Sequence, residues 1–237
     1  MNFLRYFHNA LVTLFAVING MMIYLFLMQI PYGLEPFFAS LRLWDKLSPQ
    51  IGYMLGIASI LTIAAILLCT RISIEWKNRL LYFRRDYPHP AFNAFLNNRK
   101  QPFESNTLLR AHPAIKDSGF NPQTQIDTWE KVHKQHSNVP VVLNTRIHWQ
   151  MLRDLYLISI FFLPAFLISW LWQIGIPFQY TAIYVFVFGA QTLFLFLTAR
   201  RIGWKLIDNV LAVDLGMKEG ESMDTNKRGK KPGQKKF

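Results

Sequence analysis

Three residues with the side chains of a zinc site follow one another at spacings of three: Glu130, His133 and His136. Imidazole and carboxylate groups are common zinc ligands. On a helix, however, successive steps of three carry the side chains around the axis, and a metal site usually combines one such step with a distant third ligand. Three residues elsewhere could supply that ligand: His112, Asp117 or His148. Solvated helix residues are the simpler interpretation, so we predict no metal site and no cofactor.

A second group of side chains suits the recognition of acidic surfaces. Aromatic residues alternate with basic ones between Tyr82 and Phe103, and such interleaving can stack on nucleic acid bases or hold an acidic peptide. The candidates for contact with a partner are Arg84, Arg85, His89, Phe92, Phe95, Arg99 and Lys100. In the simpler interpretation, the arginines lie near anionic lipid headgroups and the aromatic residues form a small core. That core would consist of Phe92, Phe95, Leu96 and Phe103.

Short motifs that carry an enzymatic mechanism are absent from the sequence. It contains no phosphate-binding glycine motif of the G-x-x-x-x-G-K-[ST] or G-x-G-x-x-G type, no H-E-x-x-H zinc motif and no G-x-S-x-G nucleophile motif. The single cysteine, Cys69, excludes a disulfide within one chain. We therefore predict that the protein is not an enzyme and has no catalytic residues. An enzyme whose histidines and acids meet only in the folded state is the least favoured hypothesis.

Four apolar runs flank these polar groups and must position them. Each run has about twenty residues, the length of helix that crosses the hydrocarbon core of a bilayer. The runs cover residues 10–30, 51–70, 155–175 and 180–199. The chain of 237 residues is 51% hydrophobic and 17% charged, whereas soluble proteins are about a quarter charged. The predicted fold class is an all-α polytopic membrane protein with four transmembrane helices arranged as two hairpins.

Between spans two and three lies an insert that we expect to be mostly helical and cytoplasmic. Its proline-rich, basic and aromatic middle should be joined to the membrane by helical stems, which extend the flanking spans. The predicted organisation is a first hairpin over residues 1–70, the insert over 71–153, a second hairpin over 154–199, an amphipathic helix over 200–215 and a disordered basic tail over 216–237.

Local signals refine this organisation. The first stem has apolar residues on one helical face, so we expect it to continue span two as one helix. Asn121 followed by Pro122 predicts the start of a helix that ends near His136. Residues 139–143 form a short apolar stretch that we expect to be extended. Aromatic residues between 34 and 47 predict a short helix in the membrane interface.

Two amides lie within the spans, where a side chain without a partner would face hydrocarbon. Asn19 is halfway along the first span and Gln191 is in the second half of the fourth. Because these depths are compatible, we expect a hydrogen bond between the two amides. In the second span, Gly52, Gly56 and Ser59 place small residues on nearly one face. Small residues let helix backbones approach closely, which predicts helix packing and, as a weaker signal, a homo-oligomer.

Basic residues outnumber acidic ones by 26 to 14 and are concentrated beside the spans. Between Arg71 and His148 the chain has twelve basic and six acidic residues, and from Arg200 onward it has ten and five. The positive-inside rule therefore predicts that both termini and the insert are cytoplasmic. The compact multi-pass design favours the inner membrane of a bacterial cell, with anionic lipid headgroups beside the basic stems and tail.

These features favour a protein that acts by binding other proteins or the membrane. The leading hypothesis is an inner-membrane protein whose insert binds an unidentified membrane or cytosolic protein, for example in a secretion or conjugation apparatus or in plasmid exclusion. The alternative is an oligomeric pore or membrane-disrupting effector of the kind used in phage defence or toxin systems. An oligomer could line such a pore with Asn19, Gln191, Ser59 or Thr62. Nucleic acid is a disfavoured partner because the basic tail is tethered beside a bilayer.

Overall fold

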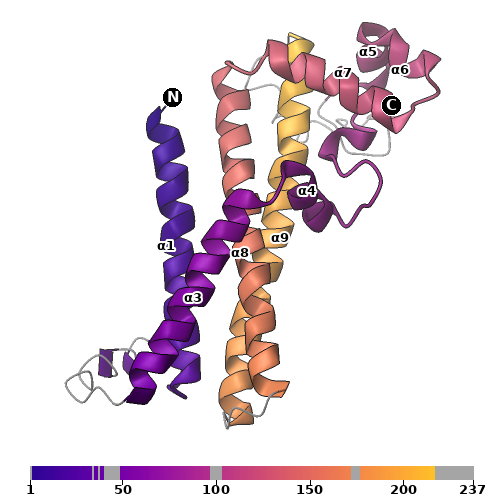
Figure 1. Ribbon diagram of the computed structural model, residues 1–237. Helices are drawn as coiled ribbons and strands as arrows, with labels where there is room; N and C mark the ends of the chain where they lie inside the picture. Colours follow the sequence, from indigo (N-terminus) through magenta and orange to yellow (C-terminus); the bar gives the residue numbers. More distant parts are fainter. Residues whose placement is uncertain are drawn as a thin grey trace, which may run out of the picture. The chain divides into compact units, whose positions relative to one another are not determined.

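The structure is a computed structural model that describes residues 2–33, 35–36, 38–39, 49–96, 103–171 and 177–216 (Figure 1). Helices account for 83% of the structure, and the described residues contain no strand. The elements are α1 (Asn2–Leu27), α3 (Pro49–Arg71), α4 (Ile74–Tyr82), the 3₁₀ helix η2 (Pro90–Asn93), α5 (Ser105–Ala111), α6 (Pro113–Asp117), α7 (Pro122–Gln135), α8 (Pro140–Leu171) and α9 (Phe178–Asp214). The prediction of an all-helical chain is confirmed.

The chain divides into two compact units. One, here called the membrane unit, consists of residues 1–77 and 150–199. The other, here called the insert unit, consists of residues 78–149 and 200–237. Helices α8 and α9 each contribute to both units. The basic segment that follows the fourth apolar run therefore belongs to the same unit as the middle of the insert.

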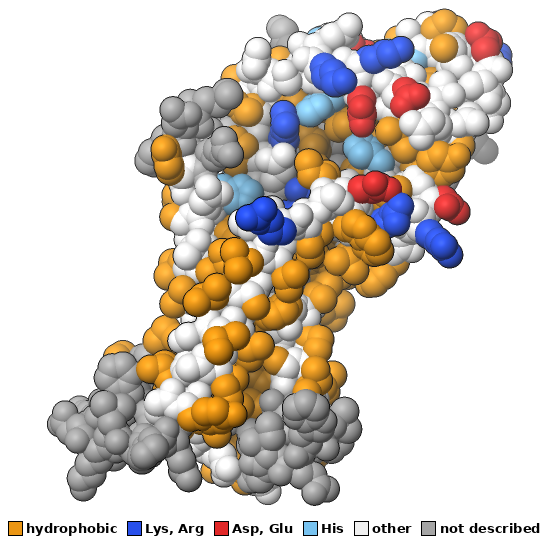
Figure 2. Space-filling view, viewed as in Figure 1, with side chains coloured by type: hydrophobic (Ala, Val, Ile, Leu, Met, Phe, Trp, Pro, Cys, Tyr) orange, Lys and Arg blue, Asp and Glu red, His pale blue; other side chains and the backbone are white. Residues whose placement is uncertain are grey.

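Within the described residues, four helices are long and apolar enough to cross a membrane: Tyr6–Leu27, Gly52–Arg71, Pro140–Ile168 and Phe178–Asp214. The membrane unit has an apolar core, but it also buries polar groups and exposes large apolar side chains. Asn19 is only 1% exposed, whereas Phe186 is 76% exposed. Hydrophobic side chains also cover the long helices of this unit on the face shown in Figure 2. Because buried polar groups and an apolar surface suit a lipid environment, these helices indicate a multi-pass membrane protein.

Aromatic rings fill part of the interior of the membrane unit. The ring centroid of Phe26 lies 4.9 Å from that of Phe166 and 5.3 Å from that of Tyr184. The ring of Phe166 is in turn 4.4 Å from that of Phe188. The hydroxyl of Tyr184 donates to the carbonyl oxygen of Ile30 at 2.9 Å. Tilted and edge-to-face rings at these distances stabilise the packing of α1, α8 and α9 beyond simple apolar burial.

Helices α1 and α3 lie side by side and approach closely at a glycine that the sequence did not single out (Figure 1). A Cβ at Gly20 would overlap the hydroxyl of Thr62, so only glycine permits this approach. By contrast, no described residue lies within 4 Å of a Cβ built at Gly52 or Gly56. These two glycines, which the sequence predicted to pack against another helix, instead lie on an open face of α3.

The insert unit has a small core of its own around α7. The side chain of Asn121 accepts from the backbone N–H of Gln123 at 2.8 Å, so α7 begins where the sequence predicted. Gln125, which is fully buried, donates to the carbonyl oxygen of Phe120 at 2.9 Å. Its Oε1 accepts from the backbone N–H of Phe95 at 3.1 Å. This amide therefore connects α7 to the segment that follows η2.

The first helical stem differs from its prediction. It is not a continuation of span two, because α3 ends at Arg71 and α4 begins at Ile74. Ser73 lies at the break, and its hydroxyl accepts from the backbone N–H of Trp76 at 3.4 Å. A serine before a helix satisfies an N–H that has no intrahelical partner, which favours a new start at this point.

A second local prediction is also wrong. We expected residues 139–143 to be extended, but residues 140–143 form the start of α8, which begins at Pro140. Proline is favoured at the first helical position because its missing N–H would have no partner there and its fixed φ suits the helix. The interfacial helix expected between residues 34 and 47 lies largely outside the described residues.

Candidate interaction site

A short loop of exposed aromatic and basic residues follows α4; we call residues 83–87 the aromatic-basic loop. Phe83 is 72% exposed and Tyr87 is 41% exposed, and Arg84 and Arg85 between them are also exposed. Both aromatic residues have a φ of 51°. This left-handed conformation is uncommon for bulky side chains and costs about 1–3 kcal/mol at each residue. The surrounding structure must therefore hold the loop in place.

Tyr82 fixes the start of this loop against α9. A Cβ at Gly203 would overlap the Tyr82 hydroxyl and lie 2.8 Å from Nε1 of Trp149. Glycine at this position therefore lets the buried rings of Tyr82 and Trp149 pack directly against the backbone of α9. The guanidinium carbon of Arg200 lies 6.0 Å from the ring centroid of Tyr82 and 5.4 Å from that of Trp204. The loop thus starts at the part of α9 that directly follows the fourth apolar run.

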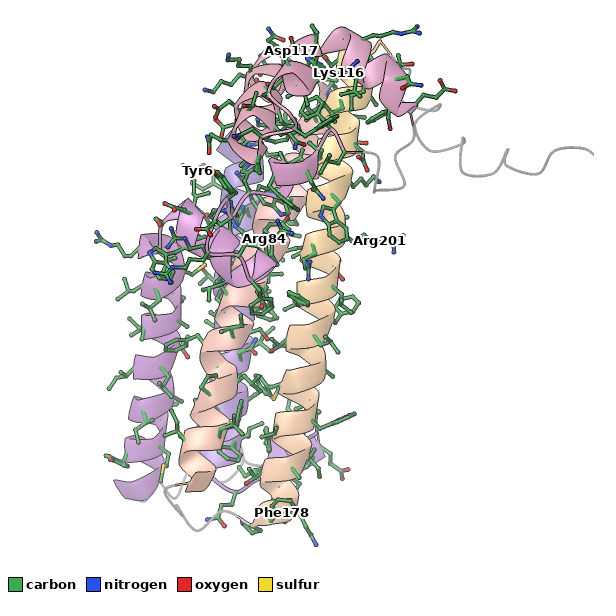
Figure 3. All side chains as sticks on the ribbon, turned by 90° about the vertical axis from the view of Figure 1, so that its right-hand side faces the viewer. Tyr6, Arg84, Lys116, Asp117, Phe178 and Arg201 are labelled. Atoms are coloured by element: carbon green, nitrogen blue, oxygen red, sulfur yellow. The ribbon has the colours of Figure 1, made fainter. Side chains whose placement is uncertain are left out.

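A cation–π contact holds the middle of the loop. The guanidinium carbon of Arg84 lies 3.4 Å from the ring centroid of Phe92, which belongs to η2. Burial and the positive charge of Arg200 lower the pKa of Arg84, although the group stays charged at neutral pH. Figure 3 shows Arg84 and Arg201 at similar levels along α9. Arg84 and Arg200 thus each lie beside an aromatic ring of the insert unit, Phe92 for Arg84 and Tyr82 for Arg200.

Two histidines lie against the indole of Trp129. The ring of His89 is 5.1 Å from it, and the ring of His133 stacks on it at 4.8 Å with an interplanar angle of 6°. Nδ1 of His89 also accepts from the backbone N–H of Ala91 at 3.1 Å and so caps η2. Burial, followed by the charge of His133, lowers the pKa of His89 to about 4. Burial and the charge of Arg146 lower the pKa of His133, so both rings are packed as neutral groups.

The three residues with zinc-type side chains do not form a metal site. His133 stacks on Trp129, whereas Nε2 of His136 lies 3.1 Å from one carboxylate oxygen of Asp214. Nε2 of His112 lies 2.9 Å from the other oxygen. Within the described parts of the chain, no group of three histidine, cysteine or acidic side chains is placed to hold a metal ion. Asp214 instead ties the end of α9 to α7 and to the junction of α5 and α6.

A buried carboxylate joins three helices of the membrane unit. Oδ1 of Asp154 accepts from Nζ of Lys77 at 2.9 Å and lies 3.7 Å from Nε of Arg153. Its Oδ2 lies 3.2 Å from Nε2 of His8. Removing one partner of a buried ion pair is costly because it leaves a charge without compensation. We interpret this cluster, which links α1, α4 and α8, as structural.

The structure brings the two intramembrane amides together. Nε2 of Gln191 donates to Oδ1 of Asn19 at 2.9 Å and to Oγ of Ser159 at 3.1 Å. Oγ of Ser159 lies 2.7 Å from the hydroxyl of Thr192, and Nδ2 of Asn19 donates to the carbonyl oxygen of Phe15 at 2.7 Å. These bonds join side chains of α1, α8 and α9 to one another.

The seven candidate contact residues fall into different environments. Arg84 and Arg85 are exposed, and His89 and Phe92 are half-buried. Phe95 is fully buried, so it belongs to the core, as in the simpler interpretation of its segment, and cannot touch a partner directly. Two candidates lie outside the described residues: Arg99 and Lys100.

Two exposed rings of the loop, those of Phe83 and Tyr87, were not among the candidates. In the sequence, Phe83 continues the apolar spacing of the first stem, which predicts a place on a helix face rather than in a loop. The proline after Tyr87 was the signal that could have identified a surface loop, because it prevents a helix from continuing.

Comparisons with known proteins do not assign the chain to a family. No protein-family model matches it, and no curated protein or solved structure resembles it closely enough to show a relationship. The function proposed below is therefore argued from the geometry of the aromatic-basic loop and from the polar contacts within the membrane unit.

Proposed function

We propose that this chain is a multi-pass membrane protein that acts by binding another protein through the aromatic-basic loop. In this proposal the four spans form two hairpins in the inner membrane of a bacterial cell, and both termini and the insert are cytoplasmic. The basic residues that follow spans two and four support this sidedness. The basic tail and stems would contact anionic lipid headgroups on the same side.

The observation that carries the proposal is the exposure of two aromatic rings on a loop that its own unit holds in place. Phe83 and Tyr87 are exposed in left-handed conformations. Tyr82 is seated on α9 at the start of the loop, and Arg84 is stacked on Phe92. Aromatic and arginine side chains dominate the binding energy of many protein interfaces. Groups that are already held in position lose less conformational entropy when a partner binds.

The charge of the loop indicates the chemistry of the partner. Arg84 and Arg85 are exposed beside the two rings, and Asp86 is the one acidic residue of the loop. A complementary surface would present an apolar patch bordered by carboxylates, which steer association and select the partner. We therefore propose an acidic protein surface, on a cytosolic protein or on the cytoplasmic side of another membrane protein.

The hydrogen bonds of the membrane unit favour a protein-binding function over the formation of a pore. A water-filled pore needs polar groups that face its lumen. The amides of Asn19 and Gln191, two of the four candidates for this role, hydrogen-bond to each other. The hydroxyl of Thr62, a third candidate, donates to the carbonyl oxygen of Ala58. Nδ2 of Asn19 and the hydroxyls of Ser159 and Thr192 also have partners within the chain, so turning these groups toward a lumen would require their bonds to break.

Gentle detergent extraction followed by affinity purification tests the proposal. The wild-type protein is compared with Phe83→Ser/Tyr87→Ser, and with the control Lys134→Ser/Gln135→Ser, which changes two exposed residues of α7. We expect one protein to copurify with the wild type and with the control, and to decrease about tenfold or more with the loop variant. Equal recovery with all three forms would contradict the proposal.

Membrane potential separates the proposal from the pore alternative. Expression of the wild-type protein should leave the potential unchanged, as reported by a voltage-sensitive dye. Depolarisation that disappears in Asn19→Leu/Gln191→Leu would favour a pore, because that double variant removes the two central amides.

A further inference from the structure

The first charged residue after the apolar stretch of α9 is Arg200, which directly follows Ala199. In a helix that crosses the membrane, a basic residue at this position is at the depth of the lipid headgroups. Its guanidinium lies near the rings of Tyr82 and Trp204, and the indole of Trp204 is partly exposed. Tryptophan is enriched at this depth because it has an apolar ring with a polar N–H. Arg200 and Trp204 therefore have the composition of a headgroup contact.

A second guanidinium reaches the same place from a distant part of the chain. Tyr82 seats on Gly203, one helical turn beyond Arg200. Arg84 follows Tyr82 by two residues, and its contact with the ring of Phe92 limits its freedom. Burial, followed by the positive charge of Arg200, lowers the pKa of Arg84. The fold thus brings the loop that carries Arg84 to the segment of α9 that carries Arg200, and an aromatic ring lies beside each of the two guanidinium groups.

We propose that Arg84 and Arg200 together bind the phosphate of an anionic phospholipid in the cytoplasmic leaflet. Guanidinium groups match the oxygens of a phosphate in geometry and charge. A bound phosphate would also remove the mutual repulsion of the two cations. The exposed ring of Phe83 next to Arg84 offers an apolar surface beside the headgroup.

Location favours a lipid phosphate over the phosphate of a nucleic acid or a soluble metabolite. Arg200 is joined without a break to a helix whose exposed surface is apolar, including Phe194 and Leu197 on the turns before it. A headgroup at Arg200 would let the acyl chains lie along that surface. This inference rests on the proposed membrane placement of α9, but it does not require the partner protein of the aromatic-basic loop.

Native mass spectrometry of the purified full-length protein tests the site, with phosphatidylglycerol and phosphatidylcholine as the added lipids. The variant Arg84→Gln/Arg200→Gln is compared with the control Arg85→Gln/Arg201→Gln, which removes the same amount of charge from two exposed neighbours. We expect the wild type to prefer phosphatidylglycerol. The affinity for the first bound phosphatidylglycerol should fall about tenfold in the site variant and less than about twofold in the control.

Several results would contradict the proposed phospholipid-binding site. Equal losses in both double variants would indicate unspecific attraction to positive charge, and equal binding of the two lipids would remove the need for an anionic headgroup. Displacement of the lipid by millimolar inorganic phosphate would assign the site to a soluble anion. If the site variant does not fold, the variant Arg84→Lys/Arg200→Lys provides the test. It retains both positive charges but loses the planar guanidinium groups. Wild-type affinity for phosphatidylglycerol in this variant would contradict the proposal. Because the titration contains no partner protein, its outcome is independent of the copurification experiment.

Discussion

The side-chain amide of Gln191 in α9 donates a 2.9 Å hydrogen bond to Oδ1 of Asn19 in α1. The two residues are 172 positions apart, so the bond joins the first and last membrane helices. An amide in hydrocarbon is costly without a partner, and each of these two groups supplies the partner for the other. The contact therefore specifies how the helices of the membrane unit pair.

Replacing either amide should destabilise the membrane unit, and replacing both should not double the effect. We expect Asn19→Leu and Gln191→Leu each to lower the free energy of unfolding by about 1 kcal/mol, because each leaves the other amide without this bond. The double variant should lose clearly less than the sum of the two. Thermal unfolding in detergent measures all three variants. Strictly additive losses would show that the two residues are not coupled.

Acidification should loosen the contact between η2 and α7. Burial lowers the folded-state pKa of His89 to about 4, from an ordinary value of 6.5. Between these two pH values the unfolded chain binds more protons than the folded one, so stability is fully present above pH 6.5 and is lost as the pH falls towards 4. The difference corresponds to roughly 3 kcal/mol over that range.

Hydrogen exchange of the peptides that contain η2 and α7 measures this effect. Their protection should fall as the pH drops from about 7 to about 5, after correction for the intrinsic exchange rate. In His89→Asn the fall should be smaller, since the only remaining depressed histidine of this contact is His133. The same acid-dependent loss in the variant would assign the effect to other groups.

A methyl group at Gly203 should disturb the anchor of the aromatic-basic loop. The added Cβ would overlap the hydroxyl of Tyr82, so Gly203→Ala should cost about 1–3 kcal/mol of stability through overpacking. Gly189→Ala in the same helix is the matched control, because no described residue lies within 4 Å of its Cβ. The control should be neutral or slightly stabilising, since alanine favours a helix over glycine by about 1 kcal/mol. Limited proteolysis within residues 83–87, together with thermal unfolding, distinguishes the two variants.

The single cysteine makes the orientation of the chain testable. Cys69 is buried, so Cys69→Ala should give a folded background without accessible thiols. We expect a cysteine introduced at Arg85 to be protected from an impermeant maleimide in intact cells, and one introduced at Tyr32 or Phe178 to be labelled. Permeabilised cells show that each thiol can react. Labelling of position 85 in intact cells would contradict a cytoplasmic insert.

Features with a strong local signal could be predicted from the sequence. The four apolar runs predicted the long helices, and Asn121 before a proline predicted the start of α7. The amides of Asn19 and Gln191 could be paired because two polar groups at similar depths in hydrocarbon have few other partners. In each of these cases, length, spacing or a capping residue determines the outcome within a short stretch of chain.

Features decided by distant contacts could not be predicted. The separation of α4 from α3 accompanies an ion pair between Lys77 and Asp154, which are 77 residues apart. Gly20 allows the close helix approach, whereas Gly52 and Gly56 face open space, although glycines in apolar helices look alike in sequence. The link from His112 to Asp214 spans 102 residues. Local spacing contains no information about such contacts.

Photo-crosslinking in living cells tests the central claim, a protein contact at the aromatic-basic loop, most directly. The photoreactive residue p-benzoylphenylalanine is introduced at Phe83, at Tyr87 or, as a control, at the exposed Lys134 of α7. We predict that positions 83 and 87 give a covalent adduct with the same protein and that position 134 does not. The absence of a protein adduct from both loop positions, or equal adducts from all three positions, would contradict a binding role for the loop.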